Sequence, residues 1–286
     1  MARASSKTAT ILEFDNEAIA AREAQVAKEQ DDEILARLEA RMQDVTDMTK
    51  AVKSGHVRAM IVSGPPGVGK SHGVETVLEK GDLLQKVAGK KPKFEVVKGA
   101  MTALGLYCKL YEFSDKNCVV VFDDCDDVLF DELSLNILKA ALDSSQRRFI
   151  SWNSDSRLLK AEDIPNRFEF KGGAVFITNI KFEHVRSRRL RGHLDALESR
   201  CHYLDLDMDT TREKLLWIDH VVKTKSMLAD RDLDAAAQKE VLDFVHANQG
   251  TLRELSLRMV LKVADLRTAF PTSWQLKAKN TCMRRA

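Results

Sequence analysis

The middle of the chain alternates short, fully apolar runs with longer stretches in which apolar residues recur at helical spacing. A short apolar run between helical stretches predicts a strand that is buried on both faces, as in a parallel sheet. The predicted strands are residues 57–62, 94–97, 118–122, 174–178 and 201–206. The helices predicted between them are residues 69–80, 102–112, 131–143 and 188–198. The pattern therefore predicts an α/β sandwich around a five-stranded parallel sheet.

Helical patterns without strands flank this region. Residues 15–53 contain no Gly or Pro, which predicts a long, charged helical segment that packs on the main domain or on a neighbouring subunit. After the last strand, apolar spacing predicts three more helices, with Thr210 and Glu213 forming a capping box at the first of them. These helices are residues 210–228, 234–247 and 251–267. They predict a small all-helical domain.

These patterns divide the chain into four segments. We expect a charged helical segment (1–53), an α/β domain (54–208), a helical lid domain (209–270) and a basic C-terminal tail (271–286). The residues after Leu266 contain five basic side chains and no acidic one, so we expect the tail to be solvated.

Composition narrows the class of protein. The 286 residues are 44% hydrophobic and 31% charged, which excludes a disordered chain. Lysine and arginine (45) nearly balance aspartate and glutamate (43), so a nucleic-acid surface must be local. No apolar run approaches the ~20 residues that span a bilayer and no signal peptide begins the chain, so we expect a cytoplasmic protein with no membrane partner. The five cysteines form no C-x-x-C pair, which indicates reduced thiols.

A phosphate-binding loop follows the first predicted strand. The residues Gly64, Pro65, Pro66, Gly67, Val68, Gly69, Lys70 and Ser71 match the pattern G-x-x-x-x-G-K-[ST] between a strand and a helix. Backbone N–H groups of such a loop surround phosphate oxygens, Lys70 neutralises β- and γ-phosphate charge, and the Ser71 hydroxyl binds Mg²⁺. We add the next residue, His72, to the expected nucleotide contacts.

Carboxylates follow the third predicted strand. Asp123 and Asp124 end the apolar run, with Asp126 and Asp127 close behind. In a phosphate-loop enzyme the first carboxylate, Asp123, holds Mg²⁺ and the second, Asp124, orients or deprotonates the attacking water. The alternative is an acidic turn at the end of a strand, without a catalytic role.

With these motifs in order, residues 54–270 resemble the AAA+ ATPases. The resemblance implies that the protein binds ATP and Mg²⁺ and hydrolyses ATP. It also implies a polar sensor residue after the fourth strand, a position that Asn179 occupies. An asparagine that only forms a turn is the alternative.

Two arginines are assigned by the same resemblance. Ser199-Arg200-Cys201 is similar to the S-R-C motif of clamp-loader subunits, which implies that Arg200 is an arginine finger acting on a neighbouring subunit. Four arginines just upstream share or replace that role, contact DNA, or lie on a solvated helix face: Arg186, Arg188, Arg189 and Arg191. Gly250-Thr251-Leu252-Arg253 resembles a helix-opening second sensor, so we choose Arg253 for the γ-phosphate and keep Arg258 as the alternative.

Three features depart from the family or extend it. Asp124 stands where the family has glutamate, so we expect slow hydrolysis. The loop 98–102 lacks the aromatic residue of protein-threading members and keeps only Met101, which either fills a gap or, with Lys98, faces nucleic acid. Residues 147–152 and 167–170 resemble an inserted β-hairpin, in which Trp152 either packs in the hairpin core or lies between bases.

Sequence segments such as VFDDCDDVL and LESRCHYLDL also resemble those of AAA+ ATPases from tailed bacteriophages. We therefore expect an ATPase motor or remodeller that acts on DNA or on a DNA replication or recombination complex in the host cytoplasm. The alternatives are a remodeller or chaperone of a protein assembly and a scaffold that hardly turns over ATP. A finger acting in trans implies a homo-oligomer, which we expect to be a hexameric ring or an open spiral.

Overall fold

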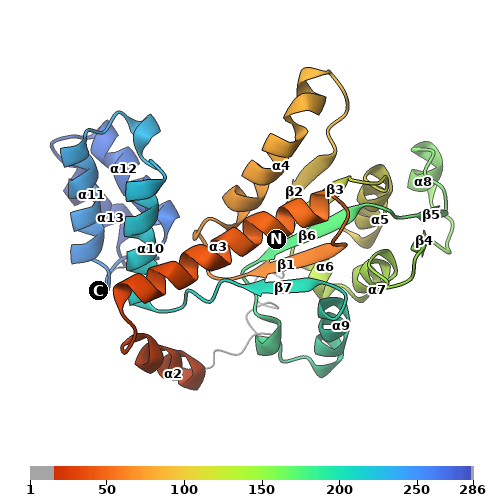
Figure 1. The fold of residues 1–286 in the computed structure, drawn as a ribbon, viewed down its shortest axis with the longest axis horizontal. Helices are drawn as coiled ribbons and strands as arrows, with labels where there is room; N and C mark the ends of the chain where they lie inside the picture. The colour runs from red at the N-terminus through yellow and green to blue at the C-terminus, as the bar shows by residue number, and fades with distance from the viewer. Residues whose placement is uncertain (1–15, 285–286) are drawn as a thin grey trace. The chain divides into compact units, whose positions relative to one another are not determined.

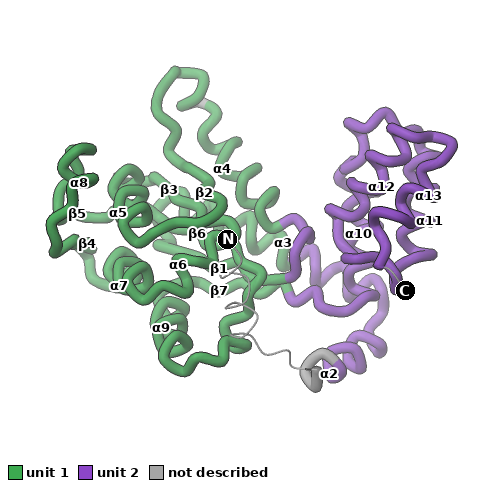
Figure 2. The backbone as a smooth tube through the Cα atoms, turned by 180° about the vertical axis from the view of Figure 1, so that it is seen from behind, with its two compact units in different colours: residues 1–15, 41–64, 70–206 green, residues 16–40, 65–69, 207–286 purple. Residues whose placement is uncertain are grey.

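The computed structural model describes residues 16–284, which form two compact units (Figure 2). The first unit contains residues 41–64 and 70–206, and the second contains residues 16–40, 65–69 and the chain from residue 207 onward. The predicted charged segment is therefore divided between the two units. Its first fifteen residues, and the last two residues of the predicted tail, lie outside the described residues.

The first unit is built on the predicted five-stranded parallel sheet (Figure 1). Its strands are β1 (Ala59–Ser63), β2 (Phe94–Lys98), β3 (Val119–Asp123), β6 (Gly173–Thr178) and β7 (His202–Asp205). They lie in the order β2-β3-β6-β1-β7, and each neighbouring pair is parallel. Every residue of the three central strands is buried, because helices cover both faces and exclude water. The predicted α/β class is confirmed.

Helices cover this sheet. They are α4 (Lys70–Val87), α5 (Ala103–Glu112), α6 (Asp127–Phe130), α7 (Glu132–Ala141) and α9 (Arg188–Glu198), with a short 3-10 helix at Phe182–His184. The side chains of Thr102, Asp131 and Ser187 cap α5, α7 and α9 by accepting backbone N–H groups, which fixes where each helix begins. Phe122 and Phe176 stack 5.2 Å apart on neighbouring strands and join the core that includes α5, α7 and α9.

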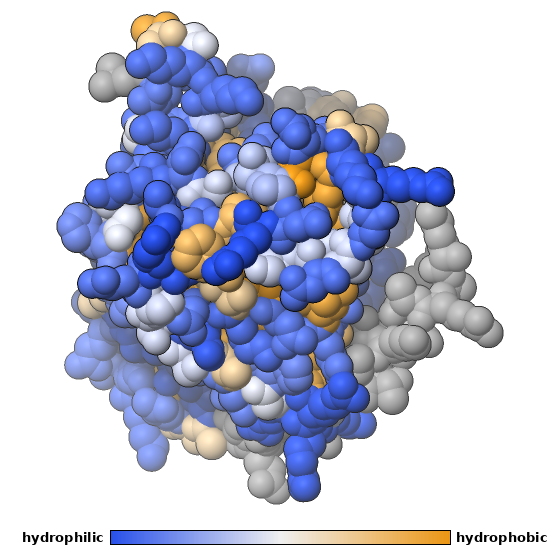
Figure 3. Space-filling view, turned by 90° about the vertical axis from the view of Figure 1, so that its right-hand side faces the viewer, coloured by the Kyte–Doolittle hydropathy of each residue, from blue (hydrophilic) through white to orange (hydrophobic). Residues whose placement is uncertain are grey.

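The predicted hairpin is present between α7 and β6. It pairs β4 (Phe149–Ser151) with β5 (Arg167–Glu169) in antiparallel register, with α8 (Arg157–Ala161) between them. Trp152 is partly buried against Tyr107, with ring centroids 5.7 Å apart, so it packs in the hairpin core. Phe149 is the exposed aromatic residue of the hairpin, 37% exposed. Figure 3 shows this side of the molecule as mostly hydrophilic, with small hydrophobic groups.

The second unit is helical, and it contains the three helices that were predicted after the last strand. It contains α2 (Asn16–Val26), the first part of α3 (Asp31–Lys53), α10 (Thr211–Thr224), α11 (Ala235–Ala247), α12 (Leu257–Ala269) and α13 (Trp274–Cys282), with a 3-10 helix at Ala229–Arg231. The chain turns between α2 and α3, so the predicted long helix is two helices. The capping box of Thr210 and Glu213 is present at the start of α10.

The expectation of a solvated C-terminal tail is wrong. Residues 274–282 form α13, which packs on the hydrophobic core of the second unit. Trp274, Ala278 and Cys282 are buried, and the Trp274 ring lies 5.3 Å from that of Phe244. These three residues are spaced four apart and therefore share one helix face. Basic residues surround this apolar stripe in the sequence, and the prediction of a solvated tail was based on them.

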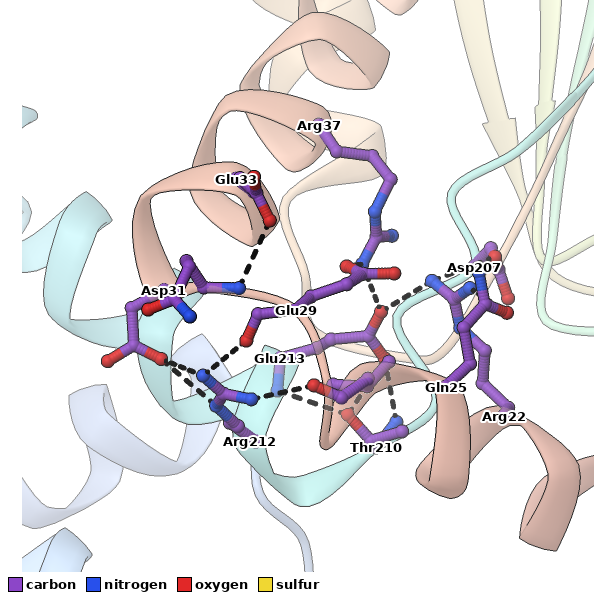
Figure 4. Close-up of polar contacts among 12 residues, drawn as sticks. Arg22, Gln25, Glu29, Asp31, Glu33, Arg37, Asp207, Thr210, Arg212 and Glu213 are labelled. Carbon is purple, nitrogen blue, oxygen red and sulfur yellow. Dashed lines mark hydrogen bonds and ion pairs between the residues drawn. The ribbon is translucent and has the colours of Figure 1, made fainter.

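A buried carboxylate joins the N-terminal helices to α10 in the second unit (Figure 4). The Glu213 side chain is 0% exposed and accepts hydrogen bonds from Arg22 (2.7 Å) and Arg37 (2.8 Å). The neighbouring Arg212 donates to two backbone carbonyls of the α2–α3 turn at 2.6 and 2.9 Å. We call Arg22, Arg37, Thr210 and Glu213 the Glu213 cluster. It holds α2 and the first part of α3 against α10 within the second unit.

Candidate nucleotide-binding site

Polar residues follow the carboxyl ends of several strands in the sheet of the first unit, whose strands can be followed in Figure 1. β1 leads into the phosphate loop, β3 ends at Asp123, and Asn179 follows β6. Because all strands run the same way, these ends meet at one edge, which is the usual place for ligands in open α/β sheets. We call Lys70, Ser71, Asp123, Asp124 and Asn179 the carboxyl-edge cluster.

Asn179 bridges a lysine and a carboxylate. Its Oδ1 accepts a hydrogen bond from the Lys70 ammonium at 2.7 Å, and its Nδ2 donates to Asp124 Oδ1 at 2.9 Å. Lys70 also donates to the Gly64 carbonyl at 2.7 Å and is 6% exposed. Both contacts of Asn179 agree with one orientation of its amide. The structure thus brings together three predicted site residues that are distant in sequence.

The Asp124 backbone adopts a left-handed conformation. Its φ is 52°, which aspartate tolerates better than most residues. The Asp124 N–H donates to the Ile177 carbonyl at 3.0 Å, which ties this turn to the end of β6. The turn leaves the Asp124 carboxylate exposed at the edge of the sheet beside Asn179, where it can contact a water molecule.

Ser71 and Asp123 have the chemistry of a magnesium site. The Ser71 hydroxyl donates to Asp123 Oδ1 at 2.8 Å, and Asp123 is nearly buried. Within residues 16–284 no three His, Cys, Asp or Glu side chains form a metal-binding group. Mg²⁺ bound with a nucleotide needs few protein ligands, because water and phosphate oxygens complete its octahedron. A hydroxyl and a carboxylate are hard oxygen ligands that fit this ion.

The two acidic residues behind this pair have structural roles. Asp126 accepts a hydrogen bond from the buried Thr178 hydroxyl at 2.7 Å, which fixes the end of β6. Burial raises the pKa of Asp126 despite this hydrogen bond. Asp127 begins α6, where a carboxylate interacts favourably with the helix dipole. The alternative of an acidic turn therefore suits Asp126 and Asp127, whereas Asp123 and Asp124 belong to the carboxyl-edge cluster.

The phosphate loop requires its glycines. Gly67 and Gly69 have φ values of 70° and 105°, a region that favours glycine. A Cβ on Gly67 would lie 2.8 Å from the Cβ of Ser256, so this glycine also permits a close approach. The Gly67 carbonyl accepts the Leu257 N–H at 2.9 Å. Residues 65–69, which include Pro65, Pro66 and Val68, are thereby held in the second unit, while His72 lies exposed in the first turn of α4.

The two candidates for the second sensor, Arg253 and Arg258, have different surroundings in the second unit. α12 begins at Leu257 after its cap Ser256, so the expectation that Arg253 opens a helix is wrong. The Arg253 N–H instead donates to the Cys282 carbonyl at 2.9 Å. The Cβ of Arg258 lies 3.4 Å from the position of a Cβ on Gly67, so Arg258 is the arginine beside the phosphate loop. The serine cap before an apolar helical pattern is the sequence signal for this helix start.

Arg200 lies at the C-terminal end of α9. Its Nη1 donates to the Ala196 carbonyl at 2.5 Å, and its buried Nε has no hydrogen-bond partner. The guanidinium therefore lies along its own helix. Burial raises the pKa of the neighbouring Cys201 thiol to about 12. The four arginines upstream are all exposed, and Arg189 pairs with Glu132 at 2.5 Å.

No family model matches the chain. Two of the similar solved structures are distant in sequence. The replication initiator DnaA bound to AMPPCP and single-stranded DNA is 11% identical, with a TM-score of 0.44 over 83% of this chain. The Aeropyrum pernix Orc1 protein in complex with DNA is 12% identical, with a TM-score of 0.46 over 86% of this chain. The chain spans less than two thirds of each, 63% and 62% respectively.

A curated phage protein is much closer in sequence. The uncharacterized 36.7 kDa protein from the nrdC-mobD intergenic region of Enterobacteria phage T4 is 32% identical over 250 residues, covering 87% of this chain and 75% of the relative. No helix in residues 16–284 is long and apolar enough to cross a membrane. At this identity and coverage, the chain belongs to the family of this bacteriophage protein.

Proposed function

We propose that the protein is a Mg²⁺-dependent ATPase that remodels DNA or a DNA-bound protein complex. The observation that carries the proposal is the chain of side-chain hydrogen bonds from Lys70 through Asn179 to Asp124. It lies beside the hydrogen-bonded pair of Ser71 and Asp123. These groups supply a cation for phosphate, a carboxylate for the attacking water and oxygen ligands for Mg²⁺.

Each residue has a role that its contacts support. Lys70 exchanges the Gly64 and Asn179 oxygens for phosphate oxygens, which carry more negative charge. Asp124 accepts a hydrogen bond from the attacking water, while the Asn179 amide holds this carboxylate in place. Mg²⁺, when bound, neutralises charge that develops on the phosphates. Asp124 is one methylene shorter than glutamate, so the water lies less favourably and turnover is slow.

Hydrolysis needs an arginine from another subunit in this proposal. Arg200 fills that role only after it leaves the Ala196 carbonyl, so the proposal requires assembly into a ring or open spiral of six subunits. Sedimentation with an ATP analogue at micromolar protein tests this step. Assembly that depends on nucleotide supports it, and monomers at every concentration contradict it.

The proposed DNA surface is the first half of α9 and the residue before its cap. Arg186, Arg188, Arg189 and Arg191 are exposed, and residues 186–193 contain no acidic side chain. A catalytic site uses one arginine finger, so four arginines exceed that need. Cations at a helix N-terminus are also unfavourable by ~0.3–1 kcal/mol each, a cost that bound phosphates would offset. Charge complementarity therefore favours a nucleic-acid backbone.

Steady-state ATP hydrolysis with and without single- and double-stranded DNA, at two salt concentrations, tests the proposal. DNA should stimulate turnover less at high salt, and Lys70→Ala should abolish it. The double variant Arg188→Gln/Arg191→Gln should lower the salt slope of DNA affinity by about two, since each lost phosphate contact removes ~0.9. Arg231→Gln/Arg267→Gln is the matched control, because these arginines pair with Asp265 and Glu240 in the second unit.

Other outcomes separate the alternatives. Turnover that depends on Lys70 but ignores DNA would identify a remodeller of proteins. Loss of DNA-free turnover in the α9 double variant would make these arginines part of a subunit interface. We also propose that the protein is encoded by a phage and acts in the host cytoplasm, on the strength of its phage T4 relative.

A further inference from the structure

Lys98 contacts the expected magnesium ligand. It is the last residue of β2, and the parallel register places it directly opposite Asp123 on β3. Side chains at paired positions of parallel strands leave the same face of the sheet. The Lys98 ammonium lies 3.3 Å from Asp123 Oδ2, and it lies 2.8 Å from Glu75 Oε1 on α4. Lys98 therefore pairs with these carboxylates of its own chain.

The two contacts of Asp123 occupy both of its oxygens. Oδ1 accepts the Ser71 hydroxyl and Oδ2 faces the Lys98 ammonium. The Asp123 side chain is 8% exposed, whereas that of Lys98 is 58% exposed. A carboxylate shielded from water in this way needs a nearby cation, because its own hydration is largely lost. Without a metal ion, Lys98 supplies that cation.

Lys98 and a divalent cation compete for the same carboxylate. An ammonium near Asp123 repels an incoming Mg²⁺, so binding of the ion requires the ammonium to withdraw. Glu75 gives it a second partner at 2.8 Å, and the Lys98 side chain is exposed enough to remain hydrated. Withdrawal therefore leaves no unpaired charge behind.

We propose that Lys98 is a positioning residue that neutralises Asp123 in the metal-free site and keeps only its contact with Glu75 when Mg²⁺ and nucleotide bind. Lys98 thereby sets how much Mg²⁺ the site requires and keeps Asp123 in place when the metal is absent. The proposal rests on the proposed function as a Mg²⁺-dependent ATPase.

The test measures metal affinity rather than turnover. The Mg²⁺ concentration that half-saturates binding of a fluorescent ATP analogue is determined for the wild type, Lys98→Met, Lys98→Arg and Glu75→Gln. Binding of Mn²⁺ alone, followed by electron paramagnetic resonance, provides a second readout without nucleotide. Lys109→Met is the matched control, because Lys109 also pairs with two glutamates, Glu95 and Glu112, and lies outside the site.

We expect Lys98→Met to lower the required Mg²⁺ concentration about fivefold, the effect of removing one partly exposed charge pair. Its melting temperature should fall in EDTA and recover with Mg²⁺, whereas a purely structural lysine would leave a deficit in both conditions. Lys98→Arg should behave as the wild type. Glu75→Gln should raise the Mg²⁺ requirement, since the ammonium then has only Asp123.

Equal metal affinity in the wild type, Lys98→Met and Lys109→Met, by both readouts, would overturn the proposal. The proposed function fails in a different way, through absence of nucleotide binding in the wild type itself. In that case the Mn²⁺ measurement still decides, because tighter Mn²⁺ binding by Lys98→Met requires only the metal site. Equal Mn²⁺ binding would then reject the role of Lys98.

Discussion

The Glu213 cluster and the carboxyl-edge cluster both pair carboxylates with cations, but they differ in exposure. The Glu213 side chain is 0% exposed and is held by two arginines and by Thr210. Asp124 and Asn179 are exposed at the edge of the sheet, and each contact in their cluster joins groups that a nucleotide or Mg²⁺ would also bind.

This difference in the exposure of side chains determines what each cluster is suited to do. A buried carboxylate keeps its partners, because no water replaces them when they leave. Exposed groups such as Asp124 and Asn179 exchange partners at little cost, which binding and catalysis require. We therefore expect substitutions in the Glu213 cluster to change stability and substitutions in the carboxyl-edge cluster to change activity.

The largest expected effect is that of Glu213→Ala. It leaves Arg22 and Arg37 without their shared carboxylate, and breaking a buried pair in this way costs ~3–5 kcal/mol. Urea unfolding measures the change. Glu240→Ala is the control, because its pair with Arg267 is half exposed and should contribute under ~1 kcal/mol. Equal losses in both variants would remove the distinction between the clusters.

The same cluster predicts a dependence on pH. Burial acts to raise the pKa of Glu213, but hydrogen bonds from Arg37, Thr210 and Arg22 outweigh it, so the pKa is lowered. A carboxylate with a lowered pKa stabilises the fold above its unfolded value, and this contribution is lost as pH falls through the folded pKa. Stability should thus fall below about pH 4.5, and Glu213→Gln should flatten that part of the profile.

In contrast to Glu213→Ala, Asn179→Ala should lower activity and leave stability nearly unchanged. It removes the bridge between Lys70 and Asp124, and turnover should fall about a hundredfold, as for other groups that position a catalytic carboxylate. Because Asn179 is exposed, the free energy of unfolding should change by less than ~0.5 kcal/mol. Turnover and urea unfolding on the same preparation provide both values. A large stability loss would make Asn179 structural.

A smaller effect, on the affinity for ATP, is expected when the two candidate sensor arginines are replaced in turn. Arg258→Ala should weaken ATP binding about tenfold, the value of one charge-assisted contact, because Arg258 lies beside Gly67. Arg253→Ala should leave affinity unchanged, since only the Arg253 backbone is held, by Cys282. Titration calorimetry compares the variants. The reverse ranking would restore the prediction from sequence.

The smallest expected effect is a gain. Asp124→Glu adds one methylene and brings the carboxylate closer to the water, so turnover should rise by a factor of about two to ten. Asp124→Asn keeps the size but removes the base, and turnover should then fall. Single-turnover phosphate release measures both. A lower rate for Asp124→Glu would show that the left-handed turn has already placed the shorter carboxylate correctly.

The sheet was predictable because its strands are continuous apolar runs, and the phosphate loop because its glycines and lysine occur at fixed spacing. Asn179 was found through the resemblance to AAA+ ATPases, which implies a polar sensor residue after this apolar strand. Helix α13 was missed because Trp274, Ala278 and Cys282 form a narrow stripe among basic residues.

Two site residues needed the structure. Arg258 is brought to Gly67 by where α12 begins, which depends on the Ser256 cap more than on the G-x-L-R pattern. Lys98 contacts Asp123 because of the register of β2 with β3. The register between two strands cannot be predicted from the sequence of either strand alone.

Phosphate release from ATP in the presence of Mg²⁺, by the wild type and by Lys70→Ala, is the decisive test of the proposed ATPase activity. We predict turnover by the wild type and a rate at least about a hundredfold lower for Lys70→Ala, with both proteins folded by circular dichroism. Equal rates in the two proteins, or a folded wild type that neither binds nor hydrolyses ATP, would contradict the account.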